Sequence, residues 1–280
     1  MSSVEMQAIP IFVISLARAL DRRARMTRHL SDLGLSYRLI DAVDGREMPE
    51  NEREKLLAPG QRYHAGVVGC YLSHLMAYQA VVDEGLPVAL VLEDDARLSR
   101  RAASLLKSGC RELDFDYCFL DSDDHNDRGP VFFDRDSASE LQTGIQAYRL
   151  SEGPQTLHAY LITTEGARKR LDVAFPIVKP IDLYDHLKYP IVFRSIVSPK
   201  LAWVSEDSLT SFTSERRDDP AALSMGALRS SPLFYLVRDW LRLKAWRGRL
   251  QVARLVREGR LPAGHRWAPL PSGREVVLER

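Results

Sequence analysis

Short apolar runs alternate along the chain with longer segments in which apolar residues recur every three to four positions. Runs of that length are typical of buried strands, and the longer spacing is typical of amphipathic helices. Gly34 and the turn residues at 85–87 close two of the helical segments. The pattern predicts strands at 9–15, 37–45 (with a turn), 88–92, 117–120 and 158–163, and helices at 21–33, 67–84, 101–110 and 164–175.

This alternation predicts the α/β class, with a mostly parallel sheet and helices on both of its faces. The strand segments are apolar at nearly every position, which is expected when both faces of a sheet are covered. We assign residues 1–205 to this domain. Residues 206–229 are polar and weakly periodic, which predicts a flexible segment, and a basic tail follows at 230–280.

The composition excludes several classes of protein. The 280 residues, 45% of them hydrophobic, suffice for a sizeable core, and the net charge of +1 argues against a general nucleic-acid binder. Three cysteines without CxxC spacing indicate neither a zinc ribbon nor a disulfide framework. The N-terminal segment does not resemble a signal peptide, and no run reaches the roughly 20 apolar residues of a membrane span. We therefore expect a cytoplasmic protein.

Three consecutive acids, Glu93, Asp94 and Asp95, follow the apolar run at 88–92. Ligands of parallel sheets bind beyond the carboxyl ends of the strands. Side chains alternate along a strand, so Glu93 and Asp95 should share one side while Asp94 points to the other. Such a carboxylate pair suits Mg²⁺ or Mn²⁺, whose remaining ligands are often substrate phosphates. A solvated loop whose acids face water is the alternative.

Two other classes of protein have acids after an apolar strand. A P-loop NTPase requires a Gly-Lys pair, and the chain contains none. A receiver domain binds Mg²⁺ with such acids and is phosphorylated on an aspartate, for which Asp121 would serve. In receivers, however, the acids follow the first strand, whereas here two strands and a long helix precede them. A receiver-like phospho-switch stays open as an alternative function.

Five segments, in order over residues 9–190, match a known pattern: "IFVISLARALDRRARM", "YRLIDAVDG", "GVVGCYLSHLMAY", "ALVLEDDARL" and "HAYLITTEGARKRL" followed by "KPID". The sequence resembles glycosyltransferase family 25, the lipooligosaccharide sugar transferases that also include collagen galactosyltransferase domains. The resemblance implies a GT-A-like, Rossmann-type catalytic domain and a divalent cation. It also implies transfer of a sugar, often galactose from UDP-galactose, to a saccharide acceptor.

In such an enzyme, Glu93 and Asp95 would hold Mn²⁺ or Mg²⁺ against the diphosphate of the donor, where the ion neutralises charge on the departing nucleotide. The residues that we expect at the nucleotide-sugar donor are Ser15, Arg18, Arg22 (with Arg23 as an equivalent choice), Asp41, Asp44, His74, Asp94 and His158. The alternatives to donor binding are a solvated helix face for the arginines, a turn at Asp44 and core packing for His74.

An inverting transferase needs a base that removes the proton of the acceptor hydroxyl. We assign this role to Asp182, at the family's Pro-x-Asp position, with Asp185 and His186 close by in sequence. The alternative is that Asp182 caps a short helix.

Residues 230–260 combine apolar positions at near-helical spacing with many arginines. A basic amphipathic helix that carries tryptophans can lie at an anionic membrane surface. The resemblance implies an acceptor of the lipopolysaccharide type, and a tail of this kind would bring the enzyme to such a glycolipid at the inner face of the cytoplasmic membrane. A helix packed on the catalytic domain is the alternative for the tail, and a non-catalytic nucleotide-sugar-binding relative is the alternative for the whole chain.

Overall fold

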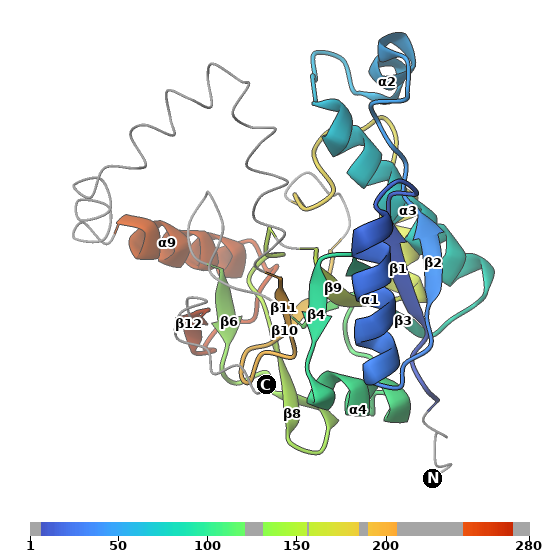
Figure 1. The fold of residues 1–280 in the computed structure, drawn as a ribbon. Helices are drawn as coiled ribbons and strands as arrows, with labels where there is room; N and C mark the ends of the chain where they lie inside the picture. The colour runs from blue at the N-terminus through green and yellow to red at the C-terminus, as the bar shows by residue number, and fades with distance from the viewer. Residues whose placement is uncertain (1–6, 121–130, 156, 185–189, 206–242, 271–280) are drawn as a thin grey trace, which may run out of the picture.

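The computed structural model describes residues 7–120, 131–155, 157–184, 190–205 and 243–270. Its centre is an eight-stranded sheet in the order β2-β1-β3-β9-β5-β10-β8-β7 (Figure 1). The strands of this sheet are β1 (Ile11–Ser15), β2 (Arg38–Asp41), β3 (Val88–Glu93), β5 (Tyr117–Phe119), β7 (Ser139–Gln142), β8 (Ile145–Arg149), β9 (Ala159–Thr163) and β10 (Phe193–Ile196).

The described helices surround this sheet, and two small sheets flank it. One small sheet joins β4 (Ala96–Leu98) to β11 (Ala202–Val204), and the other joins β6 (Phe132–Asp134) to β12 (Trp267–Pro269). The helices are α1 (Leu20–Asp32), α2 (Glu50–Leu56), α3 (Ala65–Asp83), α4 (Arg100–Ser108), α5 (Thr164–Leu171) and α9 (Leu243–Arg257).

Most strands of the large sheet run in one direction. Strand β1 is parallel to β2 and β3, and β5 is parallel to β10. Strand β9 is inserted antiparallel between β3 and β5, and β8 is antiparallel to β10 and β7. Six of the eight strands therefore point the same way, which confirms the predicted mostly parallel sheet. The reversal of β9 is the feature that matters most for the site described below.

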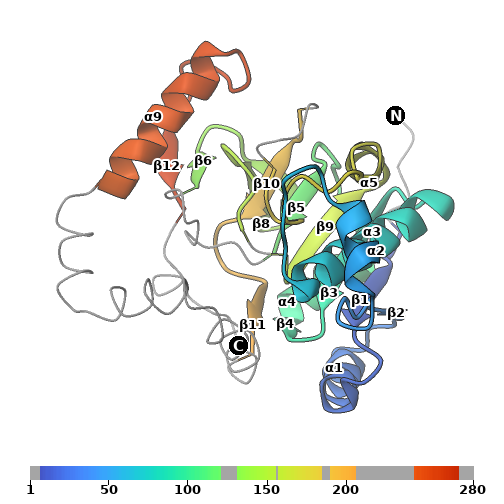
Figure 2. The same cartoon turned by 90° about the horizontal axis from the view of Figure 1, so that it is seen from above.

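Both faces of the sheet are buried, as the apolar strands predict. Along β1, Ile11 and Val13 belong to one hydrophobic cluster, whereas Phe12 and Ile14 belong to the other. Helices α1 and α4 contribute to the first cluster, and α3 and α5 to the second. Figure 2 shows α1 and α5 on opposite sides of the central strands. The prediction of helices on both faces is confirmed.

Helix α3 is the core helix of the second face. In the described part of the chain it alone is long and apolar enough to cross a membrane. Nine of its residues are buried, however, among them Tyr71, His74 and Tyr78. Packing of these side chains between the sheet and α5 accounts for the apolar composition of the helix.

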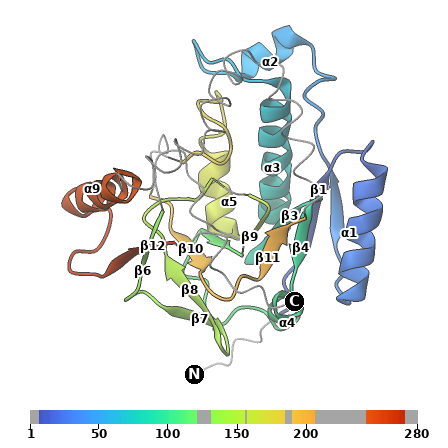
Figure 3. The ribbon, with the colours of Figure 1, turned by 60° about the vertical axis from the view of Figure 1, so that its left-hand side comes forward.

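The end of the described chain packs on the domain far from α1 (Figure 3). Val252 and Leu255 of α9 form a small hydrophobic cluster with Phe132 of β6 and with Leu261. Strand β12 then pairs antiparallel with β6. Residues 243–270 of the expected tail are thus packed against the domain, as the alternative to membrane binding anticipated. The expected flexible segment, 206–229, lies outside the described residues.

Candidate active site

The three acids lie where β3 leaves the sheet. Strand β3 is buried along its apolar length and ends at Glu93, and a turn at Asp94 and Asp95 leads into β4. Asp94 is 6% exposed and Asp95 is 7% exposed. The alternative of a solvated acidic loop is therefore wrong. Carboxylates at such depth need partners, because burial strongly disfavours an isolated charge.

Asp94 points away from the other two acids. Its carboxylate accepts a hydrogen bond of 2.5 Å from the hydroxyl of Ser15, at the end of β1, and lies 3.1 Å from Arg22 of α1. Glu93 instead faces His74 of α3 and His158, at 3.3 and 3.2 Å. Asp95 lies 3.9 Å from the same ring nitrogen of His158. The predicted geometry, with Glu93 and Asp95 on one side and Asp94 on the other, is confirmed.

The reversed strand β9 brings His158 to this place. Because β9 runs antiparallel to β3, its first residues lie beside the last residues of β3. The amide of Glu93 donates a 2.9 Å hydrogen bond to the carbonyl of His158, which fixes the two residues as neighbours. His158 therefore lies with the candidate metal ligands, whereas the sequence suggested a place at the donor sugar.

His74 is fully buried behind Glu93. Its Nδ1 is 2.7 Å from the hydroxyl of Tyr160, and that hydroxyl donates to Tyr78 at 3.1 Å. Since the single proton of Tyr160 is committed to Tyr78, Nδ1 of His74 acts as the donor to Tyr160. Nε2 of His74 lies 3.3 Å from Oε1 of Glu93, which is hydrogen-bond distance when that nitrogen carries a proton. His74 thus lies with Glu93 rather than with the predicted donor residues.

The electrostatics of the cluster favour a cation. Burial, reinforced by the charge of Glu93, raises the pKa of Asp95 to about 6. Burial also raises the pKa of Asp94, against the opposing effects of Ser15 and Arg22. For Glu93, burial works in the same upward direction, but hydrogen bonds from His158 and His74 outweigh it and lower the pKa. For Asp95, burial and the neighbouring carboxylates thus outweigh the opposing charges of His158 and Arg22.

The residues present fit a divalent metal ion. Oδ1 of Asp95 is buried and has no hydrogen-bond partner among the described residues. Glu93, Asp95 and His158 each offer a ligand atom, and these atoms lie within 4.8 Å of one another. Two carboxylates and one imidazole suit Mn²⁺ and, with more water ligands, Mg²⁺. An ion here would satisfy the unpartnered oxygen.

The predicted donor residues on β1, α1 and β2 gather beside the acids. Arg18 pairs with Asp44. Arg23 pairs with Asp41 at 2.6 Å and donates to the carbonyl of Ser15 at 2.7 Å. Since β1 and β2 are parallel and adjacent, their carboxyl ends form one edge that carries these arginines. The arrangement provides cationic groups next to a candidate metal site, which is what a diphosphate requires.

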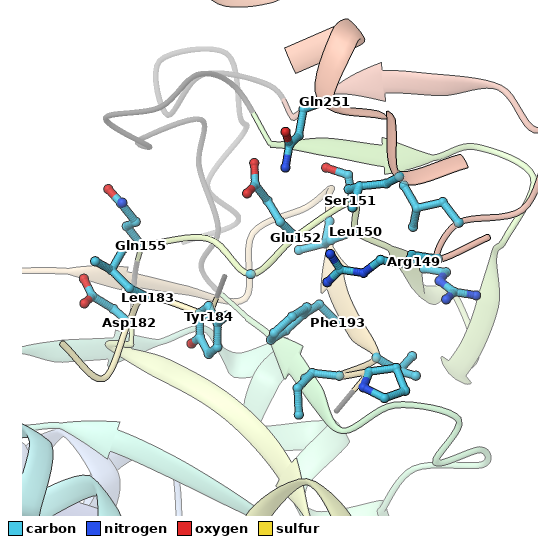
Figure 4. A pocket seen from close by; sticks show the side chains of 17 residues that line it. Arg149, Leu150, Ser151, Glu152, Gln155, Asp182, Leu183, Tyr184, Phe193 and Gln251 are labelled. Atoms are coloured by element: carbon cyan, nitrogen blue, oxygen red, sulfur yellow. The ribbon is translucent and has the colours of Figure 1, made fainter. Parts of the chain in front are cut away.

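Asp182 lies in a turn at one end of a pocket (Figure 4). Burial, followed by the charge of Glu93, raises its pKa, so it lies within electrostatic reach of the acids. The next two residues are not helical, so the described structure does not support a helix cap. Asp185 and His186 lie outside the described residues. The side chains that line the pocket include those of Arg149, Gln155, Tyr184, Phe193, Gln251, Leu255 and Arg260.

Several site features went unrecognised in the sequence. Arg170 of α5 is 1% exposed and donates to the carbonyl of Ile181, which fixes the backbone next to Asp182. Gln251 of α9 lines the same pocket from the C-terminal segment. Cys70 lies one helical turn before His74. Only the last of these carried a usable signal, namely the four-residue spacing of two metal-binding side chains on one helix.

The sequence profile of glycosyltransferase family 25 (LPS biosynthesis protein) matches residues 8–184. The chain belongs to glycosyltransferase family 25. It is 32% identical over 213 residues to procollagen galactosyltransferase 1-A of Xenopus laevis, covering 68% of this chain and 33% of that protein. The chain thus spans about a third of the length of this relative.

Other matches include a relative that is named as probably inactive and a solved structure of low similarity. The probable inactive glycosyltransferase 25 family member 3 of Bos taurus is 38% identical over 114 residues, covering 37% of this chain and 19% of that protein. The crystal structure of a glycosyltransferase involved in the glycosylation of the major capsid of PBCV-1 superposes with a TM-score of 0.32 at 7% identity, over 60% of this chain and 65% of that one. Family membership excludes the receiver alternative but not an inactive relative.

Proposed function

We propose that this protein is a metal-dependent, inverting glycosyltransferase that moves a hexose, galactose from UDP-galactose by preference, to a saccharide of a lipopolysaccharide or lipooligosaccharide. The observation that carries the proposal is the unpartnered Oδ1 of Asp95, set between Glu93 and His158. It lies next to the segment after β1, including the start of α1, that carries Arg18, Arg22 and Arg23. The family supplies the reaction class, and galactose follows the named activity of the Xenopus relative.

Glu93, Asp95 and His158 would hold Mn²⁺ or Mg²⁺. When bound, the ion supplies positive charge that stabilises the departing nucleoside diphosphate. Ser15 and Arg22 hold Asp94 and so help to fix the turn that carries Asp95. His74 orients Glu93 from behind through its own bond to Tyr160.

The acceptor saccharide binds in the pocket of Figure 4. The aromatic rings of Tyr184 and Phe193 lie 4.6 Å apart and provide an apolar surface for a sugar ring. Gln155 and Gln251 offer groups that can hydrogen-bond to hydroxyls. Asp182, at one end, takes the proton of the attacking hydroxyl, and its raised pKa brings it nearer the basicity that a general base needs at neutral pH.

We further propose that α9 brings the enzyme to the inner face of the cytoplasmic membrane, where a glycolipid acceptor would be met. Trp246 is 62% exposed and Leu250 is 50% exposed, one turn apart on the surface of the helix. Arg249 and Arg254 are exposed beside them. Apolar side chains flanked by arginines can enter the headgroup region of an anionic membrane.

One experiment distinguishes an active transferase from an inactive member of the family. The second possibility is considered because the bovine relative is named as probably inactive. The full chain is incubated with UDP-galactose and a lipooligosaccharide acceptor, with Mn²⁺ or with EDTA, and UDP release and galactose incorporation are measured. We expect transfer with Mn²⁺ that EDTA abolishes. A nucleotide sugar that raises the melting temperature without any transfer would identify a binding protein instead.

A further inference from the structure

A second group of side chains with potential metal ligands lies next to the candidate metal site and shares Glu93 with it. Cys70 and His74 are four residues apart on α3 and so lie on the same side of the helix. Together with Glu93, they offer three ligand atoms within 4.8 Å of one another. The proposed transfer reaction does not use the thiol of Cys70, and His74 enters it only by positioning Glu93.

One distance in this group equals the spacing of neighbouring ligands on a tetrahedral ion. Zinc bonds of about 2.0–2.3 Å place neighbouring ligands roughly 3.3–3.8 Å apart. Nε2 of His74 lies 3.3 Å from Oε1 of Glu93. The bond from Nδ1 to Tyr160 orients the ring as the outer partners of metal-bound histidines do. Without an ion or an added proton, a lone pair and a carboxylate would face each other here.

We propose that Cys70, His74 and Glu93 form a zinc site, and that zinc bound there weakens the binding of the catalytic cation. When Zn²⁺ binds, the Cys70 thiol loses its proton to solvent and coordinates the ion as a thiolate. A water molecule can take the fourth coordination position. Thiolate and imidazole favour Zn²⁺ over Mn²⁺ and Mg²⁺. The pair of carboxylates at the neighbouring site favours the harder ions.

The two sites are coupled through Glu93. Oε1 of this residue faces His74, whereas Oε2 faces His158. A zinc ion on Oε1 withdraws negative charge from Oε2, and the two cations repel each other at short range. The coupling is reciprocal, so manganese must weaken zinc binding by the same factor. That this limits catalysis rests on the proposed function, whereas the zinc site itself does not.

The site is tested first by cobalt binding to the full chain, because Co²⁺ occupies zinc sites and reports thiolate ligation by a charge-transfer absorption. We expect this absorption in the native protein and its loss on addition of Zn²⁺. It should vanish in Cys70→Ser and Cys70→Ala and persist in Cys110→Ser, which alters the other half-buried thiol. An absorption that survives both Cys70 variants, or its absence from the folded native protein, would overturn the site.

The coupling is tested by the electron paramagnetic resonance signal of free Mn²⁺, which needs no transfer activity. Zinc should raise the dissociation constant for Mn²⁺ about tenfold in the native protein and in Cys110→Ser, and leave it unchanged in Cys70→Ser. Equal effects in all three proteins would refute the coupling. If cobalt and manganese behave as expected but no sugar is transferred, the zinc site stands and the proposed function fails.

Discussion

Asp95 and Asp116 are buried acids beside strands of the same sheet, and they differ in their partners. Asp116 is 3% exposed, and its carboxylate accepts two hydrogen bonds from Lys169, at 2.9 and 3.0 Å, and one from the amide of Val192 at 2.7 Å. Asp95 is 7% exposed, yet its Oδ1 has no hydrogen-bond partner in the described structure. Burial alone does not distinguish the two residues. This difference in partners is what we expect if Asp116 supports the fold and Asp95 binds a ligand, as proposed above.

The largest expected effect is on catalysis. Asp95→Asn should lower sugar transfer on the order of 10³-fold, about 4 kcal/mol, because an amide is a poor ligand for a hard cation. The fold should persist, as seen by circular dichroism. Transfer rates with Mn²⁺ are the measurement, and Asp83→Asn on the exposed end of α3 is the matched control. Full activity of the variant, or of the native enzyme in EDTA, would remove the metal from the mechanism.

At Asp116 we expect a loss of stability and no direct effect on metal binding. Replacing it with Ala leaves the ammonium of Lys169 and the amide of Val192 without their partner and should lower the free energy of unfolding by about 3 kcal/mol. Urea denaturation measures the change. Any variant that remains folded should retain its affinity for Mn²⁺. An unchanged unfolding free energy would break the contrast between the two acids.

A variant of Asp182 tests whether this acid serves as the general base and not as a metal ligand. Asp182→Asn should lower kcat by roughly 10²-fold, about 2.7 kcal/mol, and leave the KM for the donor nearly unchanged, since a base acts only in the transition state. Steady-state kinetics with varied donor and acceptor provide both constants. A collapse of donor affinity would instead place Asp182 on the metal or the sugar.

The raised pKa of Asp95 should also affect how the stability of the metal-free protein depends on pH. Its folded pKa of about 6 is above the ordinary value of 3.8, so its contribution to stability is lost as the pH rises through 6. Asp95→Asn removes this penalty and should be more stable than the native protein by about 2–3 kcal/mol at pH 8, with a gap that narrows toward pH 4. Denaturation across pH measures the gap. A gap that is constant with pH would contradict a raised pKa.

The smallest effect concerns α9, where a comparable contrast exists between two faces of one helix. Its inner face, with Val252 and Leu255, is packed, whereas Trp246 and Leu250 are exposed. Trp246→Ser with Leu250→Ser should weaken sedimentation with anionic vesicles at low salt, by about 1–2 kcal/mol, without loss of stability. Val252→Ser is the control, because it should destabilise the protein instead. Unaltered vesicle binding by the double variant would exclude this face as the anchor.

Apolar periodicity was sufficient to predict the principal strands and helices. Strands β1, β3 and β9 are buried on both faces, and the helices packed on the sheet bury one side. Periodicity did not reveal β6, β7 and β8, which are short and contain polar residues, so that they form no continuous apolar run. It also did not reveal that β9 runs antiparallel to its two neighbours.

The same limit applied to the candidate site. Glu93 and Asp95 were predictable because they end an apolar run. The places of His158 and Gln251 were not, since the first depends on the reversal of β9 and the second on the packing of α9. Contacts of that kind join distant parts of the chain and leave no local pattern in the sequence.

The antiparallel pairing of β3 with β9 also governs when the site can come into being during folding. Glu93 and His158 are 65 positions apart, so a long loop must close before the two side chains can meet. A slip of β9 by one residue would turn His158 to the opposite face of the sheet. The ligand set therefore exists only in a chain that has completed this pairing in the correct register, and cation binding would stabilise that state selectively. The metal would thus act as a check on the central sheet as well as a participant in the chemistry.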